Sequence, residues 1–146
     1  MTSTLLPPAG VGGEVAALLP RPVPVQLLDP DGHLTPDEQY DVPQTDALVE
    51  MYRRMVIGRR FDVQATALTR QGRLAVYPSS RGQEACQVAG VMAMKSTDWL
   101  FPTYRESMAL VTRGIDPEKV LTLLRGDWHC GYDPVAERTA PQCTPL

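Results

Sequence analysis

The distribution of proline constrains the fold of this chain more than any other feature. Eight of its 14 prolines lie within the first 43 residues, and proline lacks a backbone donor and disrupts helix interiors and central strands. Residues 1 to about 22 also contain few large side chains, which is typical of disorder. We therefore predict a disordered or extended N-terminal arm over residues 1–43 and a folded region over residues 44–146.

The composition argues against several classes of partner. The formal net charge is −3, which gives no basic field for nucleic acid and no polybasic patch for an anionic membrane. No run approaches the roughly 18 apolar residues of a membrane span. The three cysteines form no Cys-x-x-Cys pair and suit neither a disulfide framework nor a zinc knuckle. We expect a cytoplasmic protein with reduced thiols that binds neither nucleic acid nor a membrane.

Within the arm, a short apolar run over residues 23–28 is followed by the turn sequence Asp-Pro-Asp-Gly at residues 29–32. Proline presets φ, aspartate bonds its own backbone, and glycine tolerates a positive φ. We interpret this part of the chain as an extended arm that lies on a partner surface.

The folded region shows the spacing of four helices. Apolar residues recur every three or four positions over residues 45–71, and a glycine follows where a helix would end. A Ser-Arg-Gly-Gln sequence with capping-box spacing precedes a second helix over residues 83–94. A third helix is expected to begin at Thr103. An Asp-Pro sequence at 116–117 begins a fourth, which ends at Gly126. We expect the remaining residues to be irregular.

The helix predicted over residues 83–94 has two faces. One face consists of Ala85, Val88, Ala89 and Met92, and the other consists of the small residues Cys86, Gly90 and Ala93. A face of small residues lets another backbone approach closely, which indicates packing more often than chemistry. Because a free cysteine in such a place behaves as a small hydrophobe, we do not interpret Cys86 as a nucleophile.

The most informative stretch is residues 103–106. Thr103 and Glu106 have capping-box spacing, which would place Tyr104 and Arg105 in the first turn of a helix. Such a turn has unpaired N–H groups and a positive partial charge, and a guanidinium beside it favours a bound phosphate. The alternative is that Arg105 forms an ion pair with Glu106 or with a neighbouring carboxylate.

Six short motifs follow one another along the chain. They are Met51-Tyr52-Arg53-Arg54-Met55 through Arg59-Arg60-Phe61-Asp62, Gln71-Gly72-Arg73-Leu74, Gly82-Gln83-Glu84-Ala85, Asp98-Trp99-Leu100, Tyr104-Arg105-Glu106 and Arg113-Gly114. Each motif alone is weak, but their joint order is specific. In this order they resemble the α subunits of thiamin-diphosphate-dependent 2-oxoacid dehydrogenases.

The resemblance implies an α/β thiamin-diphosphate-binding fold, represented here by its mainly helical N-terminal region with an extended arm. Members of the family decarboxylate a 2-oxoacid on thiamin diphosphate and transfer the acyl group to a lipoyl-bearing acyltransferase. They are heterotetramers of two α and two β subunits, with the cofactor at the α/β interface. The resemblance assigns the cofactor diphosphate to Tyr104 and Arg105.

The last four residues separate the subfamilies. The sequence Cys143-Thr144-Pro145-Leu146 resembles the Ser-Ser-Pro-Leu stretch of the branched-chain type. By that resemblance, Leu146 supports the bent cofactor and Thr144 contacts it, while main-chain groups at Cys143 and Pro145 hold a potassium ion. The alternative is a proline-rich coil without a ligand.

Other parts of the family's site have no counterpart in this sequence. The Gly-Asp-Gly/Ala…Asn motif that holds magnesium is missing, and so is the family's later active-site histidine. The metal reading of His129 and Cys130 has little support, because His33 is the only other histidine. We therefore assign no catalytic residue to this chain. Three hypotheses remain: a branched-chain α subunit, a pyruvate or acetoin dehydrogenase α subunit, or a truncated chain that only binds partner subunits.

Overall fold

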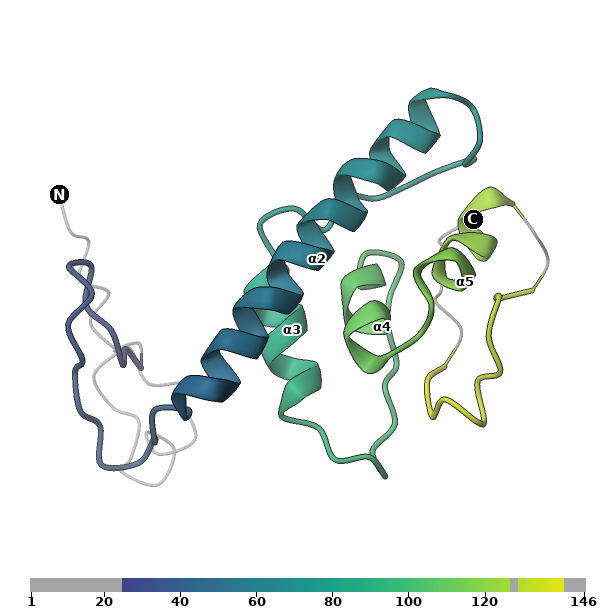
Figure 1. Cartoon of the computed structure of the whole chain (residues 1–146). Helices are drawn as coiled ribbons and strands as arrows, with labels where there is room; N and C mark the ends of the chain where they lie inside the picture. Colours follow the sequence, from purple (N-terminus) through teal and green to yellow (C-terminus); the bar gives the residue numbers. More distant parts are fainter. Residues whose placement is uncertain (1–24, 127–128, 141–146) are drawn as a thin grey trace, which may run out of the picture. The chain divides into compact units, whose positions relative to one another are not determined.

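The computed structural model describes residues 25–126 and 129–140, so the segment predicted to be disordered lies outside the described residues. The chain divides after Val42 into two units. The described residues contain four α-helices, α2 to α5, and no β-strand beyond two isolated bridges (Figure 1). The expectation of a mainly helical chain is therefore confirmed. None of these helices combines the length and apolar character needed to cross a bilayer.

A tight turn occupies residues 29–33 of the first unit. The Asp29 carboxylate accepts hydrogen bonds from the backbone N–H groups of Asp31, at 2.9 Å, and His33, at 2.8 Å. Gly32 has a φ of 86°, a conformation that glycine adopts without steric cost. The predicted Asp-Pro-Asp-Gly turn is confirmed.

Helix α2 spans Thr45–Arg70, one residue shorter than predicted. Its buried residues are Gly58, Phe61, Asp62 and Ala65. Gly72, after the helix, has the positive φ of 70° expected of a glycine at a helix end. Gly58 lies where α2 and α4 approach each other, because a Cβ atom there would overlap the side chain of Met108. The glycine therefore serves close packing.

The apolar spacing that predicted α2 lies partly outside the core. Leu48, Tyr52 and Val56 are 45%, 66% and 51% exposed, whereas Met51 and Met55 are half-buried. Periodicity indicates that a helix forms but not which of its faces another element covers. Much of the first half of α2 therefore presents apolar side chains to solvent.

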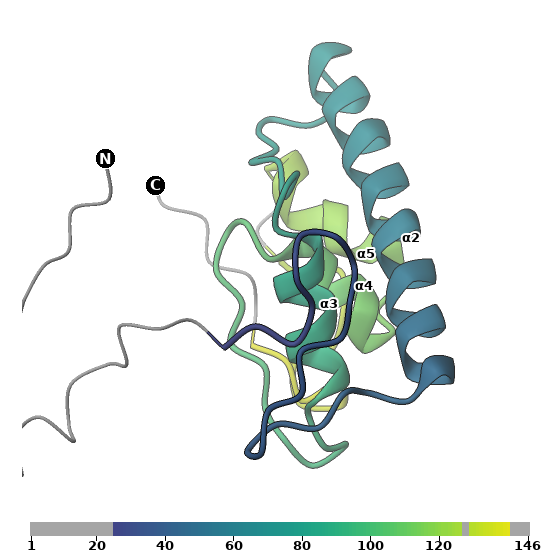
Figure 2. The ribbon, with the colours of Figure 1, turned by 90° about the vertical axis from the view of Figure 1, so that its left-hand side faces the viewer.

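Three shorter helices complete the second unit. They are α3 (Glu84–Met92), α4 (Ser107–Arg113) and α5 (Pro117–Thr122), and a 3-10 turn, η1 (Leu123–Arg125), continues α5. The predicted N-cap of α5 is confirmed, since the Asp116 carboxylate accepts the N–H of Glu118 at 2.8 Å. Helices α3 and α4 lie side by side and both contact α2 (Figures 1 and 2).

The buried face of α3 differs from both faces that the spacing defined. Its buried residues are Glu84, Gln87, Val88 and Val91. Cys86, Gly90 and Ala93, the small-residue face, are exposed. Two of the buried residues are polar because the adjacent segments offer them hydrogen-bond partners, which hydrophobic spacing does not reveal.

The core joins α2, α4, α5 and the segment after η1. Its buried members are Phe61, Ala65, Leu74, Leu110, Ile115, Val120, Leu124 and Tyr132. The hydroxyl of Tyr132 donates to the carbonyl of Ala140 at 3.0 Å, and Leu100 bridges to Thr139. Residues 129–140 form no helix, which agrees with the irregular segment expected there.

Candidate functional site

Tyr104 and Arg105 precede α4 instead of forming its first turn, which corrects the predicted helix start at Thr103. The Glu106 half of the capping box is present, because the Glu106 carboxylate accepts the N–H of Thr103. The helix nevertheless begins at Ser107. Tyr104 and Arg105 therefore lie immediately before the N-cap of α4, Glu106, and not within the first turn of the helix.

Tertiary hydrogen bonds explain the later start of α4. In a longer helix, the carbonyl of Arg105 would accept the N–H of Ala109. That carbonyl instead accepts from the Ser80 hydroxyl at 2.6 Å and from Gln87 Nε2 at 3.2 Å. The N–H of Ala109 is bound by Gln87 Oε1 at 3.1 Å. Gln87 thus bonds to both groups that would have extended the helix, and the Ala109 N–H also donates to the Glu106 carbonyl at 3.0 Å.

The guanidinium of Arg105 is held by uncharged groups. Its Nη1 donates to the carbonyl of Ser79 at 2.7 Å, and its Cζ lies 5.3 Å from the centroid of the Tyr104 ring. Among residues 25–126 and 129–140, no carboxylate lies within ion-pair distance of Arg105. The alternative of an ion pair with Glu106 is therefore not observed. Arg105 thus presents a half-buried positive charge that has no ion-pair partner among these described residues.

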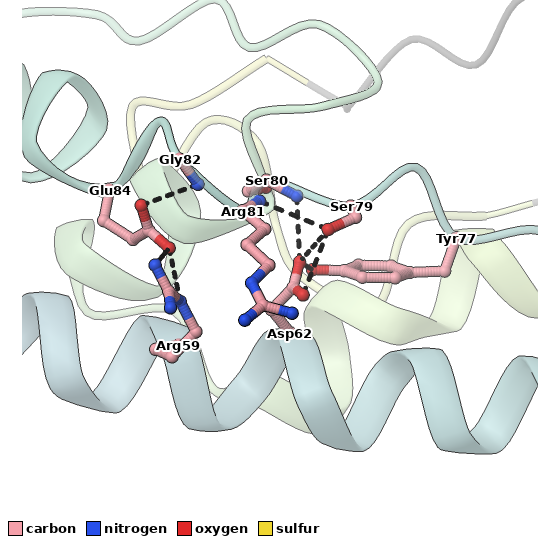
Figure 3. Close-up of polar contacts among 8 residues, drawn as sticks. All are labelled: Arg59, Asp62, Tyr77, Ser79, Ser80, Arg81, Gly82 and Glu84. Carbon is pink, nitrogen blue, oxygen red and sulfur yellow. Dashed lines mark hydrogen bonds and ion pairs between the residues drawn. The ribbon is translucent and has the colours of Figure 1, made fainter.

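A buried carboxylate on α2 organises the neighbouring loop. Asp62 accepts hydrogen bonds from the hydroxyl of Tyr77 at 2.9 Å, from the hydroxyl of Ser79 at 2.8 Å and from the N–H of Ser80 at 2.9 Å (Figure 3). Burial, and then the hydrogen bond to Asp62 and its charge, raise the pKa of the Tyr77 phenol well above its usual range. The sequence offered Asp62 only as part of a family motif and gave no sign of this role.

The capping box predicted between Ser80 and Gln83 does not form. Ser80 is buried and its hydroxyl donates to Arg105, so it does not cap α3. The N-terminus of α3 is arranged by Glu84 instead, whose carboxylate accepts the N–H of Gly82 at 2.8 Å. The prediction failed because a distant segment offers the serine a better-placed acceptor.

Glu84 also links α3 to α2. Arg59 Nε donates to its carboxylate at 2.6 Å, and a second guanidinium nitrogen completes the ion pair (Figure 3). Burial by itself would raise the pKa of Glu84. Hydrogen bonds from its own N–H, from Arg59 and from Gly82, with the charge of Arg59, bring that pKa below its ordinary value. The pair fixes the α2/α3 contact on one side of residues 79–82.

A groove of about 540 Å³ runs along the exposed face of α3. Its lining includes Cys86, Gly90, Met94, Leu100 and Glu106, but neither Tyr104 nor Arg105. Cys86 is exposed in this groove, so it does not pack in the core of this unit. Arg105 does not line this groove, but two of its neighbours do: Glu106, next in the chain, and Gln87, which donates to the Arg105 carbonyl.

Several predicted ligands cannot be placed. Cys143, Thr144, Pro145 and Leu146 lie outside the described residues. His129 is exposed, and the Cys130 thiol contacts the carbonyl of Tyr132 at 3.2 Å. Within the described ranges, the single group with metal-ligand spacing is Asp29, Asp31 and His33. Its Asp29 carboxylate already binds the turn's own backbone N–H groups.

Known proteins resemble most of this chain. The family model described as "Dehydrogenase E1 component" matches residues 52–137. The 3-methyl-2-oxobutanoate dehydrogenase subunit alpha of Mycobacterium tuberculosis is 42% identical over 125 residues, which cover 84% of this chain and 34% of that protein. The pyruvate dehydrogenase E1 component subunit alpha of Staphylococcus epidermidis is 35% identical over 102 residues, covering 70% and 28%. That of Acholeplasma laidlawii is 32% identical over 113 residues, covering 77% and 33%. The chain spans about a third of the length of these relatives.

Proposed function

The chain belongs to the dehydrogenase E1 component family, and from this premise we propose that it is part of the α subunit of a branched-chain 2-oxoacid dehydrogenase. The complete enzyme would decarboxylate a 2-oxoacid in the cytoplasm and transfer the acyl group to a lipoyl-bearing acyltransferase. The higher identity and longer match to the mycobacterial 3-methyl-2-oxobutanoate dehydrogenase subunit support the branched-chain type.

The observation that carries the proposal is the unneutralised charge of Arg105. A guanidinium has five N–H donors, and the described residues use one of them, for the carbonyl of Ser79. The remaining donors and the neighbouring phenol of Tyr104 form a set that suits the oxygens of a diphosphate. The donor chemistry therefore fits one end of thiamin diphosphate, which Tyr104 and Arg105 would bind and orient.

The rest of the cofactor site is proposed from the family motifs. Thiamin diphosphate supplies a thiazolium ring that acts as an electron sink. Thr144 and Leu146 would contact it, main-chain groups of Cys143 and Pro145 would hold a potassium ion, and the magnesium ligands would come from outside this sequence. The β subunit would provide the other half of the site in a two-α, two-β assembly.

A pyruvate dehydrogenase α subunit is the second candidate function, favoured by the staphylococcal relative and its shared motifs. An acetoin dehydrogenase would share the same motifs. A third possibility is a non-catalytic chain that only binds partner subunits, and the exposed apolar residues of α2 favour it. Release of carbon dioxide from 2-oxoisovalerate, compared with pyruvate, separates the first two candidates.

Substitution of Arg105 by alanine tests whether its guanidinium binds the cofactor diphosphate. In the enzyme assembled with its β subunit, Arg105→Ala should raise the thiamin diphosphate concentration for half-maximal activity about tenfold or more, because a charged hydrogen-bond donor is lost. Arg73→Ala, at an exposed arginine outside the site, is the matched control. An unchanged cofactor requirement in the Arg105 variant would remove the proposed role.

A further inference from the structure

A buried carboxylate that has no cation beside it must recover its lost hydration energy through hydrogen bonds. Asp62 is 4% exposed, and in the described part of the chain no lysine or arginine lies within ion-pair distance of it. Such a group is retained only if hydrogen bonds replace its lost hydration. Within the described residues, the hydrogen-bond donors to Asp62 all belong to residues 77–80. The carboxylate on α2 is therefore bound to one short loop (Figure 3).

The same loop contacts Arg105 at two points. The carbonyl of Ser79 accepts from the guanidinium at 2.7 Å, and the hydroxyl of Ser80 donates to the Arg105 carbonyl at 2.6 Å. Asp62 binds the hydroxyl of Ser79 and the N–H of Ser80. Each of the two serines thus joins Asp62 to Arg105, one through the side chain and the other through the main chain of the arginine.

We propose that Asp62 is the positioning residue of the anion site, acting through Ser79 and Ser80 to hold Arg105 ready for a diphosphate. The inference rests on the proposed diphosphate-binding function of Arg105. An arginine fixed in advance loses less conformational freedom on binding its ligand, so its affinity is higher. Asp62 does not touch the ligand in this scheme. It determines where the guanidinium is before the ligand arrives.

The substitution Asp62→Asn keeps the size of the side chain and removes its charge. The Tyr77 hydroxyl, the Ser79 hydroxyl and the Ser80 N–H all donate to Oδ1, and the Ser79 hydroxyl also reaches Oδ2. The amide lacks the second acceptor and the negative charge, so its hydrogen bonds to residues 77–80 are weaker. Asp46→Asn is a matched control, because Asp46 lies on the same helix, is exposed and takes no part in the network. Ser79→Ala is a milder variant that removes a donor to Asp62 and keeps the carbonyl that binds Arg105.

The test is a titration of the full 146-residue chain with inorganic pyrophosphate, followed by the NMR signals of the Tyr104 and Arg105 amides and the Arg105 Nε–H. Asp62→Asn should weaken the fitted affinity about tenfold, Ser79→Ala should weaken it severalfold, and Asp46→Asn should leave it unchanged. In an Arg105→Ala background, Asp62→Asn should have no further effect, because the residue acts through Arg105. A purely structural role would weaken binding equally in both backgrounds.

The outcomes separate this inference from the proposed function. If Arg105→Ala weakens pyrophosphate binding but neither Asp62→Asn nor Ser79→Ala does, the positioning role is wrong and the diphosphate site stands. Where Arg105→Ala leaves the titration unchanged, or no Arg105 signal moves in the unmodified chain, both are wrong. If the Asp62→Asn variant does not fold, a double-mutant cycle of Ser79→Ala and Arg105→Ala tests the positioning role instead. If the losses of pyrophosphate affinity in the two single variants add up in the double variant, the positioning role is wrong.

Discussion

At the scale of single residues, the pair of Asp62 and Tyr77 gives a measurable pH signature. Burial, the hydrogen bond to Asp62 and the Asp62 charge raise the pKa of the phenol, so the folded state favours the protonated phenol. The resulting stabilisation is complete below the unfolded value of about 10 and is lost as the pH rises through the folded pKa. Unfolding free energy should therefore fall in alkaline solution.

Asp62→Asn should lower the pKa of Tyr77 while leaving it above the value of a free phenol, because burial, the largest cause, remains. Ultraviolet difference titration of tyrosinate absorbance measures this, with a Tyr77→Phe variant to identify the Tyr77 contribution. A Tyr77 titration that Asp62→Asn does not move would show that the hydrogen bond at 2.9 Å does not persist in solution.

The family motif predicts Tyr104 and Arg105 as site residues, but it does not predict the contacts that hold them. Tyr104 and Arg105 were identified from their motif, and they do lie together. Asp62 and Gln87 were missed because buried polar side chains have no periodic signal, and their partners lie 15 to 22 positions away in the chain. Long-range hydrogen bonds of this kind become visible only once the helices are packed.

At the scale of elements, the helices that rest on local signals were predicted well and the one that rests on tertiary contacts was not. Helix α2 has a long apolar repeat, and α5 has an Asp-Pro N-cap sequence, so their starts at Thr45 and Pro117 agree with expectation. The start of α4 moved from Thr103 to Ser107 because the carbonyl of Arg105 bonds to α3 and its preceding loop. Local capping rules consider only neighbouring residues, so they do not predict that donors from α3 and its preceding loop will occupy the Arg105 carbonyl.

The packing of α2 on α4 predicts opposite effects for two glycine-to-alanine substitutions. At Gly58 the new methyl group overlaps Met108, which is 1% exposed and has little room to move. Overpacking costs about 1–3 kcal/mol, and the gain in helix propensity of about 1 kcal/mol offsets only part of it. Gly58→Ala should thus lower the free energy of unfolding by up to about 2 kcal/mol, measured by urea unfolding.

A methyl group added at Gly90, in contrast, would have no other atom within 4 Å. Gly90→Ala should therefore raise the free energy of unfolding by about 0.4–1 kcal/mol. Equal effects of the two substitutions would contradict this account.

The outer face of α2 predicts association of the isolated chain. Val49, Val56 and Val63 recur every seven positions and are 62%, 51% and 50% exposed, so they form a line on one side of the helix. Contiguous exposed apolar surface usually marks a contact with another chain. The purified chain should therefore scatter light as more than a monomer or bind a hydrophobic dye.

Replacing Val56 and Val63 by glutamate should reduce both the light scattering and the dye binding. Val76→Glu should reduce neither, because Val76 is 50% exposed but lies outside any helix. A monomer that binds no dye would contradict the expectation.

At the scale of the whole molecule, the chain alone should release no carbon dioxide from 2-oxoisovalerate, even with thiamin diphosphate and magnesium. It spans 34% of its mycobacterial relative, and its sequence lacks the family's magnesium motif. Each missing electrostatic or proton-transfer contribution is worth roughly 10²- to 10³-fold in rate. A radiometric assay of the purified chain measures this, with the chain plus a β subunit and a complete α subunit as the positive comparison. Cofactor-dependent release by the chain alone would show that replacement groups exist.

The two contacts between residues 79–80 and Arg105 make substitutions at position 79 and at position 62 differ in their consequences. The Arg105 guanidinium is bound by a main-chain carbonyl, which every amino acid at position 79 provides. The carboxylate that fixes the loop comes from one side chain, and no other described residue takes its place. In the proposed scheme, a change of Ser79 removes one hydroxyl donor to Asp62 but keeps the carbonyl that binds the arginine, whereas a change of Asp62 removes the acceptor for the whole loop. The proposed anion site would then depend on a side chain that does not contact the anion.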